Sequence, residues 1–128
     1  MASRPIELIL AKQWSDLLGR PALLIATNGE HLSHNEAAHA LLGAAFHRDG
    51  GEARDDWDER IRFSGPDGDQ SLFQTAVGRA LKSGLPEHGT YVLTNTRSTP
   101  TVRVSAIPVH GLDQTLLGVL VLLHEAAA

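Results

Sequence analysis

The sequence predicts an α+β domain, in which a five-stranded antiparallel sheet carries helices on one face and an amphipathic helix precedes the sheet. Two observations support this prediction. Apolar residues recur at helical spacing in residues 6–17 and 72–83. Three strand-like segments, separated by turn-forming residues, close the sequence. With two shorter strands after the first helix, the sheet has five members.

The composition is that of one folded domain. The chain has 128 residues, of which 42% are hydrophobic and 20% are charged, so it can bury a core but is too short for a two-domain enzyme. Lys and Arg number 11 against 15 Asp and Glu, giving a formal charge of −4, and they form no basic cluster. We therefore expect no direct contact with nucleic acid.

The chain contains no cysteine, which excludes a disulfide framework, a thiolate nucleophile and a cysteine-ligated zinc site. Its longest uninterrupted apolar run, residues 116–123, is much shorter than the ~20 residues that a membrane-spanning helix needs. An acidic residue, Glu7, lies where the apolar stretch of a signal peptide would build up. We expect a cytoplasmic protein with no membrane partner.

The first helix begins at Pro5, because proline is favoured at a first helical position, and Glu7 complements the helix dipole in the first turn. The residue before a proline is disfavoured in a helix, so the pair Arg20 and Pro21 stops it after Gly19. The apolar positions of this helix are Ile6, Leu10, Trp14 and Leu17.

A buried strand follows at residues 22–26, and a return strand at residues 31–34. Between them, Asn28 and Gly29 both tolerate the positive φ of a type I′ turn, which predicts a hairpin. Asn35 then serves as the N-cap of a short helix.

Gly43 is suited to the position just after the end of that short helix. Residues 44–69 show no clear periodicity and are predicted to be irregular. Residues 72–83 form the strongest helical pattern in the chain, and Gly84 ends it. Three large apolar residues are expected to anchor the irregular segment to the core: Trp57, Ile61 and Phe63.

The closing strands are predicted at residues 87–95, 100–109 and 115–124. In the middle strand one face is apolar and the other mixed, and the alternation alone does not fix which face meets the core. The last strand is apolar on both faces, so its outer side must also be covered, by the N-terminal helix, by a second subunit or by both.

This order of elements, together with short motifs at matching places, resembles a PAS domain of the bacterial sensor type over residues 17–125. The resemblance divides the chain into an N-terminal helix at 1–19, a PAS domain at 20–125 and a tail at 126–128. The segments that carry it are 24–29, 34–38, 41–43, 57–60, 66–68, 79–84, 102–109 and 117–121.

The resemblance implies a sensory module of signal transduction, without enzymatic activity, that binds a small molecule or a partner protein and signals by conformational change or dimerisation. In such domains a pocket lies between the inner face of the sheet and the long helix. Its candidate lining residues are Trp57, Phe63, Phe73, Val77, Leu81, Tyr91 and Val104. Arg103 and Tyr91 are the polar groups best able to orient a ligand.

The outer face of such a sheet packs against the N-terminal helix and often a second subunit, which implies a homodimer. PAS domains that drive a downstream effector usually end on an Asp-x-Thr motif, whereas this chain has His124-Glu125-Ala126 there. An effector kinase or transcription regulator is therefore expected in trans or in a missing part of the chain. The candidate interface residues are Ile6, Leu10, Trp14, Leu17 and Leu120.

The absence of cysteine excludes the covalent flavin adduct and the thioester-linked chromophore of light-sensing PAS domains. Haem-binding members usually ligate iron through a histidine on the long helix. Residues 72–83 contain no histidine and His88 lies beyond them, which argues against haem. No residue points to a non-covalent flavin, so the sequence leaves the cofactor unknown.

Metal binding and catalysis are less well supported by the sequence. His31, His34 and His39 are close in sequence, but alternation along a strand should send the first two to opposite faces, so we expect exposed histidines and no metal site. In the acidic run at 55–60, Asp55 or Asp56 is expected to cap a short helix, with Trp57 packed inward, rather than to form a catalytic pair. The alternatives to a sensory module are a small α+β enzyme with a cone-shaped cavity and a ligand-free dimerisation module.

Overall fold

The structure is a computed structural model that describes residues 5–42, 52–66, 68–94 and 99–125. Helices α1 and α2 flank the first hairpin, and the 3-10 helices η2 and η3 adjoin α3 and α4. The helical elements are α1 (Ile6–Leu17), α2 (Glu36–Leu42), α3 (Arg54–Trp57), η2 (Asp58–Arg60), η3 (Leu72–Gln74) and α4 (Ala76–Ser83). None of the helices within the described ranges is long and apolar enough to cross a membrane.

The strands form one sheet in the order β2-β1-β7-β6-β5-β3-β4, with every neighbouring pair antiparallel. The five predicted strands are present within two residues of their expected ends. The strands are β1 (Ala22–Ala26), β2 (His31–His34), β3 (Arg62–Gly65), β4 (Gly68–Ser71), β5 (Glu87–Leu93), β6 (Thr101–His110) and β7 (Leu116–Glu125).

Two strands, β3 and β4, were not expected, because they lie in the segment predicted to be irregular. Each has four residues, and β3 buries only the side chain of Phe63 completely. Strands this short and polar lack the alternation that marks a strand in a sequence. They form because β3 adds to the edge of β5, where Phe63 pairs with Leu93.

The predicted helix at 72–83 is divided in two. Residues Leu72–Gln74 form the 3-10 turn η3, and α4 begins only after Thr75, whose extended backbone and side-chain oxygen cap the helix. Gly84 ends α4 with a φ of +69°, as predicted. The N-cap at Thr75 explains the division, since a residue in an extended conformation cannot continue a helix.

The first hairpin turns as predicted but not as a type I′ turn. Gly29 has a φ of +89°, whereas Asn28 keeps a negative φ and accepts a hydrogen bond from the Glu30 N–H at 3.0 Å. Asn35 caps α2, because its side-chain oxygen accepts from the Ala38 N–H at 2.9 Å. The predicted end of α2 at Gly43 lies outside the described residues.

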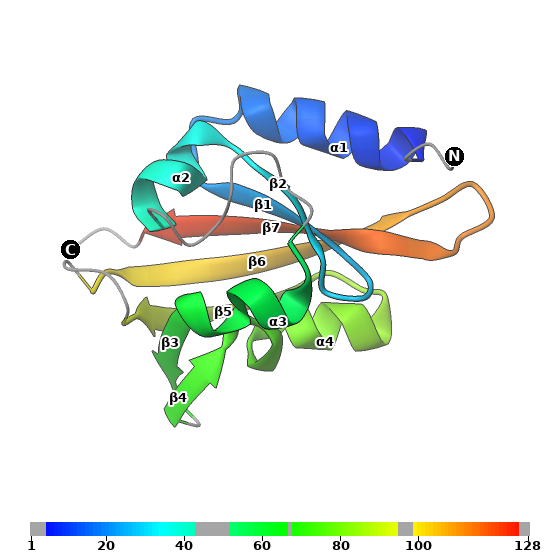
Figure 1. Cartoon of the computed structure of the whole chain (residues 1–128). Helices are drawn as coiled ribbons and strands as arrows, with labels where there is room; N and C mark the ends of the chain where they lie inside the picture. Colours follow the sequence, from blue (N-terminus) through cyan, green and yellow to red (C-terminus); the bar gives the residue numbers. More distant parts are fainter. Residues whose placement is uncertain (1–4, 43–51, 67, 95–98, 126–128) are drawn as a thin grey trace.

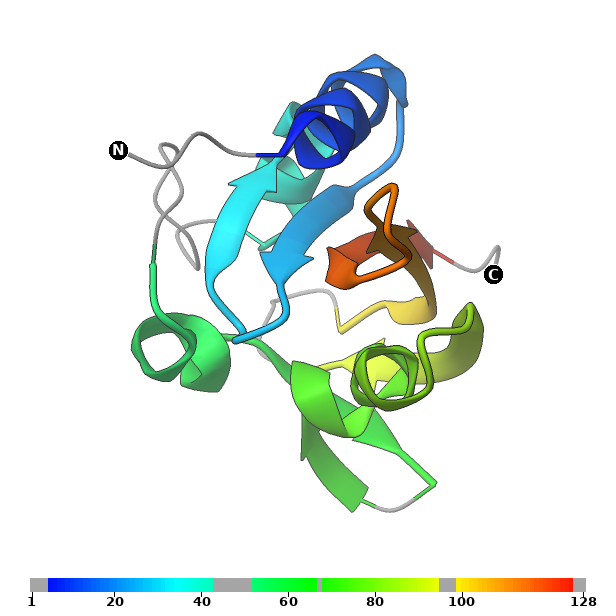
Figure 2. The ribbon, with the colours of Figure 1, turned by 90° about the vertical axis from the view of Figure 1, so that its right-hand side faces the viewer.

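The curled sheet separates two layers (Figures 1 and 2). On its outer face lies α1, against β1, β2, β6 and β7, and on its inner face lies α4, against β5, β6 and β7. The main core lies on the inner side, where Val102, Val104 and Ala106 of β6 are fully buried. This settles the open question of which face of β6 meets the core: Arg103 and Ser105 are on the outer face.

Candidate functional site

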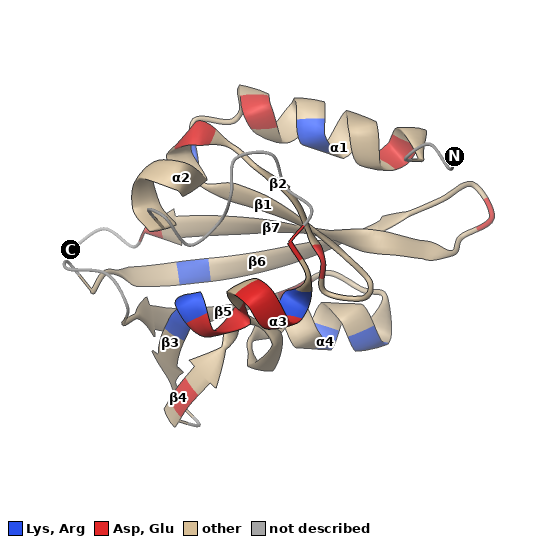
Figure 3. Cartoon of the chain, viewed as in Figure 1, with Lys and Arg blue, Asp and Glu red and all other residues tan. Residues whose placement is uncertain are grey.

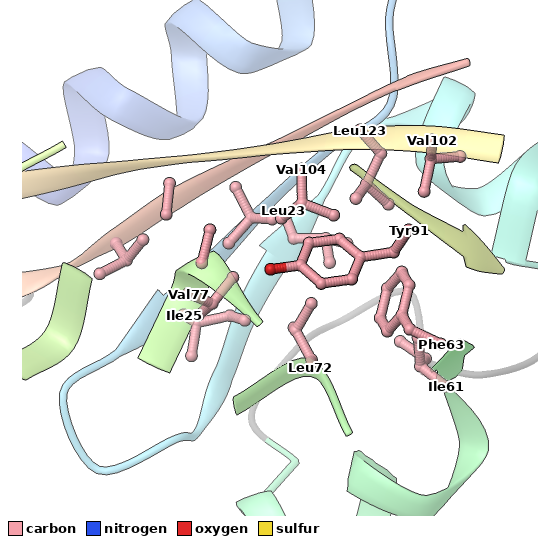
Figure 4. Packing of buried hydrophobic residues seen from close by; sticks show 14 of the residues in the cluster. Leu23, Ile25, Ile61, Phe63, Leu72, Val77, Tyr91, Val102, Val104 and Leu123 are labelled. Carbon is pink, nitrogen blue, oxygen red and sulfur yellow. The ribbon is translucent and has the colours of Figure 1, made fainter. Parts of the chain in front are cut away.

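The seven residues predicted to line an inner pocket all belong to the main core or pack against it. Trp57, Phe63, Val77 and Val104 are fully buried and Tyr91 nearly so, while Phe73 and Leu81 are partly buried. Figure 4 shows the ring of Tyr91 among Val104, Phe63 and Leu72.

Aromatic rings contact one another within this core. The rings of Trp57 and Phe73 lie 5.3 Å apart, and those of Phe63 and Tyr91 meet edge to face at 6.0 Å. Arg54 covers the outer side of the Phe73 ring, with its guanidinium carbon 4.0 Å from the ring centre. Among the described residues, these side chains therefore pack against one another where a ligand was predicted, and their role in ligand binding stays a prediction.

A cavity lies on the opposite face of the sheet, between the end of α1 and strands β6 and β7. We call it the outer groove. It has a volume of about 400 Å³. Its lining residues are Trp14, Leu18, Arg20, Arg103, Ser105, Leu122, Leu123 and His124.

The polar end of the outer groove is basic. In the register of the sheet, Arg103 on β6 lies opposite His124 on β7. The Arg20 guanidinium contacts the His124 ring. Two carboxylates on neighbouring elements are paired with other side chains: Asp16 with Lys12 at 2.9 Å, and Glu87 with Arg79 at 3.2 Å. In the part of the chain that the structure describes, no carboxylate pairs with Arg20 or Arg103.

A smaller cavity of about 220 Å³ adjoins the outer groove on the side of β5. Arg103 and Ser105 line both cavities, and His88 of β5 lines the smaller one. The two hollows thus meet in the first half of β6, where Figure 3 shows a basic segment, while acidic segments gather on α3. The sequence indicated Arg103 as a polar group for a ligand, but not that Arg20 would join it.

Helix α1 has apolar residues on two opposite sides. Its sheet-facing side buries Leu8, which packs with Leu24 and Leu120 in a second, smaller core cluster. Of the predicted interface residues, Ile6, Leu10, Trp14 and Leu17 are exposed, from 49% for Trp14 to 85% for Leu17. Leu120 is only 3% exposed, because this chain's own α1 covers it, so it is not available to a second copy.

Asn35 ties α1 to the sheet. Its side-chain amide donates to the carbonyls of Ser15 at 2.9 Å and Arg20 at 2.7 Å, at the end of α1, and its oxygen accepts from the Ala22 N–H at 3.1 Å in β1. The sequence identified Asn35 only as a helix cap. Its link to α1 depends on contacts between residues 15–20 positions apart, which no local pattern indicates.

The three neighbouring histidines are arranged differently from the prediction. His34 hydrogen-bonds through Nδ1 to Nε2 of His31 at 3.0 Å, and through Nε2 to Nδ1 of His39 at 3.1 Å, and His31 is fully buried. The expectation of exposed rings on opposite faces is wrong. A bulge in β2 is the reason: Leu23 pairs with His34 but Ile25 with His31, so one extra residue returns both rings to the inner face.

These contacts use the ring nitrogens for hydrogen bonds. Among residues 5–42, 52–66, 68–94 and 99–125, no group of three or more His, Asp or Glu side chains has an arrangement that could hold a metal ion. That the chain binds no metal stays a prediction.

The acidic run around Trp57 forms α3 and η2. Trp57 packs inward and is fully buried, as predicted. The N-cap of α3 is Ala53, with no side-chain hydrogen bond, so the prediction that Asp55 or Asp56 caps the helix is wrong. Both are in its first turn instead, where their charge complements the helix dipole.

Burial raises the pKa of Asp58 above its usual value of 3.8, against the opposing effect of Arg54. One carboxyl oxygen of Asp58 is buried and has no hydrogen-bond partner among the residues described. A carboxyl group whose pKa is raised by folding stabilises the fold when protonated, and this contribution is lost as the pH rises through the raised pKa. At neutral pH the charged form therefore opposes folding.

We expect Asp58→Asn to raise the melting temperature at pH 7, and the gain to shrink as the pH falls toward 3.8. Asp113→Asn is a control for which the melting temperature should change in the opposite direction, because the hydrogen bond from the Thr115 N–H lowers the pKa of Asp113. It should lower the melting temperature at pH 7. Calorimetry across this range checks both, and a lower melting temperature for Asp58→Asn at pH 7 would contradict the assignment.

Comparisons with known proteins bear on the fold. No protein-family model and no curated protein matches the chain. Among solved structures, it is similar to the PAS domain of BvgS from Bordetella pertussis, with a TM-score of 0.69 and 15% identity, covering 96% of this chain and 88% of that one. It is also similar to a PAS domain from Colwellia psychrerythraea, with a TM-score of 0.58 and 11% identity, covering 92% and 97%. The predicted PAS fold is confirmed.

Proposed function

We propose that this chain, which has the PAS fold, is a cytoplasmic sensory module of signal transduction that works as a homodimer joined through α1. The observation that carries the proposal is the second apolar side of α1. Ile6, Leu10 and Leu17 are exposed while the opposite side of the same helix is packed on the sheet. An exposed apolar stripe of this kind is typical of an interface between protein chains.

The signal in this proposal is a change in how α1 packs. One side of α1 contacts the sheet through Leu8 and is tied at its end by Asn35, and the other side contacts the second copy. A small ligand or partner protein that favours one packing of α1 would shift the population of dimer arrangements. An effector kinase or transcription regulator, in trans or in a further part of the chain, would read that shift.

The module has no catalytic role of its own in this proposal. The residues predicted to line an inner pocket are apolar or aromatic apart from the hydroxyl of Tyr91, which is not the set of converging ionisable groups that a cone-shaped enzyme cavity requires. The packing of these residues against one another favours, as a second candidate, a dimerisation module that takes no ligand. The two candidates share the α1 interface and differ in whether a small molecule alters it.

Leu10→Asp is expected to convert the dimer to a monomer, because it places a charge at the centre of the exposed stripe, where the second copy would bury it. Light scattering coupled to size-exclusion chromatography measures the molar mass. Leu10 is a better choice than Trp14, since Trp14 also lines the outer groove.

Leu85→Asp is the matched control, because Leu85 is 62% exposed and lies between α4 and β5, away from α1. This variant should remain dimeric. A monomeric wild-type chain at high protein concentration, or a Leu10→Asp variant with the molar mass of a dimer, would overturn the proposed interface.

A further inference from the structure

We propose that the outer groove binds a small organic anion, namely a carboxylate carried on a flat apolar body. The inference deepens the proposed sensory function, on which its link to signalling rests, while the binding itself does not depend on dimerisation. It moves the ligand from the inner face, where the described side chains pack against one another, to the face of the sheet that carries α1.

The basic end of the groove calls for an anion. Arg20, Arg103 and His124 converge there from three segments, the end of α1, β6 and β7. Neither arginine pairs with a carboxylate among the described residues. Because both arginines line the same groove, an anion bound there would be attracted by two positive charges.

The geometry of the donors selects an oxyanion. A guanidinium presents parallel N–H groups that match the two oxygens of a carboxylate, and such charge-assisted pairs are among the strongest hydrogen bonds in proteins. Ser105, two residues along β6 from Arg103, adds a hydroxyl on the same face of the sheet. The groove therefore offers charge and directed hydrogen bonds at one end.

The rest of the groove lining is apolar and partly aromatic. Trp14 contributes from α1, Leu18 from just after it, and Leu122 from β7, directly opposite Ser105. A flat apolar body can lie against the indole of Trp14 while its carboxylate meets the arginines. The volume of about 400 Å³ is within the range of small-molecule sites, and the mixture of apolar walls and few polar groups is typical of them.

The position of the groove supplies the link to signalling. Trp14, Leu18 and Arg20 belong to the end of α1 and the residues just after it, where Asn35 also holds the helix. A ligand in the groove would join this end of α1 to β6 and β7. It would therefore favour the packing of α1 seen in the structure over packings in which α1 is displaced.

Benzoate is a suitable probe, with benzamide as its uncharged counterpart of the same shape and inorganic phosphate as an anion without an apolar body. Isothermal titration calorimetry measures the affinity of the wild-type chain and of two variants. Arg103→Gln removes a charge from the groove, whereas Lys82→Gln removes one from the exposed end of α4.

We expect benzoate to bind the wild type and Lys82→Gln equally, and Arg103→Gln at least about tenfold more weakly, because a charged hydrogen-bonded pair is lost. Benzamide should not bind measurably. The inference is overturned if the wild type does not bind benzoate, if Arg103→Gln binds it as well as the wild type does, or if phosphate binds more tightly than benzoate.

Light scattering on the same samples separates the two proposals. Benzoate binding by a monomeric chain would contradict the proposed dimer and support the groove. A dimer that fails to bind benzoate would contradict the groove and leave the proposed interface supported.

Discussion

Trp57→Ala should lower the free energy of unfolding by about 3–5 kcal/mol, the range for removing a large aromatic side chain from a packed core. Trp57 is fully buried, its ring contacts Phe73, and its indole N–H donates to the Gly29 carbonyl at 3.0 Å. The substitution would therefore leave a cavity and deprive the first hairpin of a hydrogen bond. Chemical denaturation measures the loss.

Trp57→Phe is the matched control. It keeps an aromatic ring in the core and removes the indole N–H, so the loss should be about 1–2 kcal/mol. The comparison also distinguishes a packed core from a ligand cavity. If Trp57 lined a cavity, its removal would enlarge an existing space at little cost, and a loss below about 1 kcal/mol for Trp57→Ala would contradict the packed interior.

Asn35→Ala should lower the free energy of unfolding by about 2–4 kcal/mol, because the side chain joins three elements and is only 4% exposed. Without it, the Ala22 N–H and the Ser15 and Arg20 carbonyls lose their hydrogen bonds to the side chain, and α2 loses its cap. Amide hydrogen exchange should show faster exchange in α1 than the global loss alone explains.

Asn35→Ser separates the two roles of this residue. Serine is also a favourable N-cap, so α2 should remain capped, but its shorter side chain cannot reach the end of α1. We expect an intermediate loss of stability with the same faster exchange in α1. Unchanged exchange in α1 for both variants would show that Asn35 does not hold the helix to the sheet.

The sequence predicts the elements whose signals are local. The turn at Gly29, the cap at Asn35 and the end of α4 at Gly84 each depend on the backbone preferences of one or two residues, whereas α1 ends at Leu17, two residues before the predicted stop after Gly19. The last strand is apolar on both faces, which predicted that something covers its outer side, and α1 does so over Leu120.

What the sequence did not predict depends on contacts between distant segments. β3 and β4 exist because β5 offers an edge to pair with, not because their own residues favour strands. The row of histidines depends on a single bulge in β2, and one extra residue reverses which face a side chain takes. The outer groove gathers Arg20, Arg103 and His124, which lie as far as 104 positions apart in the chain.

The most direct test of the proposed interface is disulfide cross-linking of Gln13→Cys. The chain has no other cysteine, and Gln13 is exposed on α1 beside the apolar stripe. Mild oxidation should cross-link Gln13→Cys into a covalent dimer, because paired α1 helices bring the two thiols within reach, whereas Ser83→Cys on α4 should not cross-link. If both variants cross-link equally, or if Gln13→Cys remains monomeric, α1 does not join two copies.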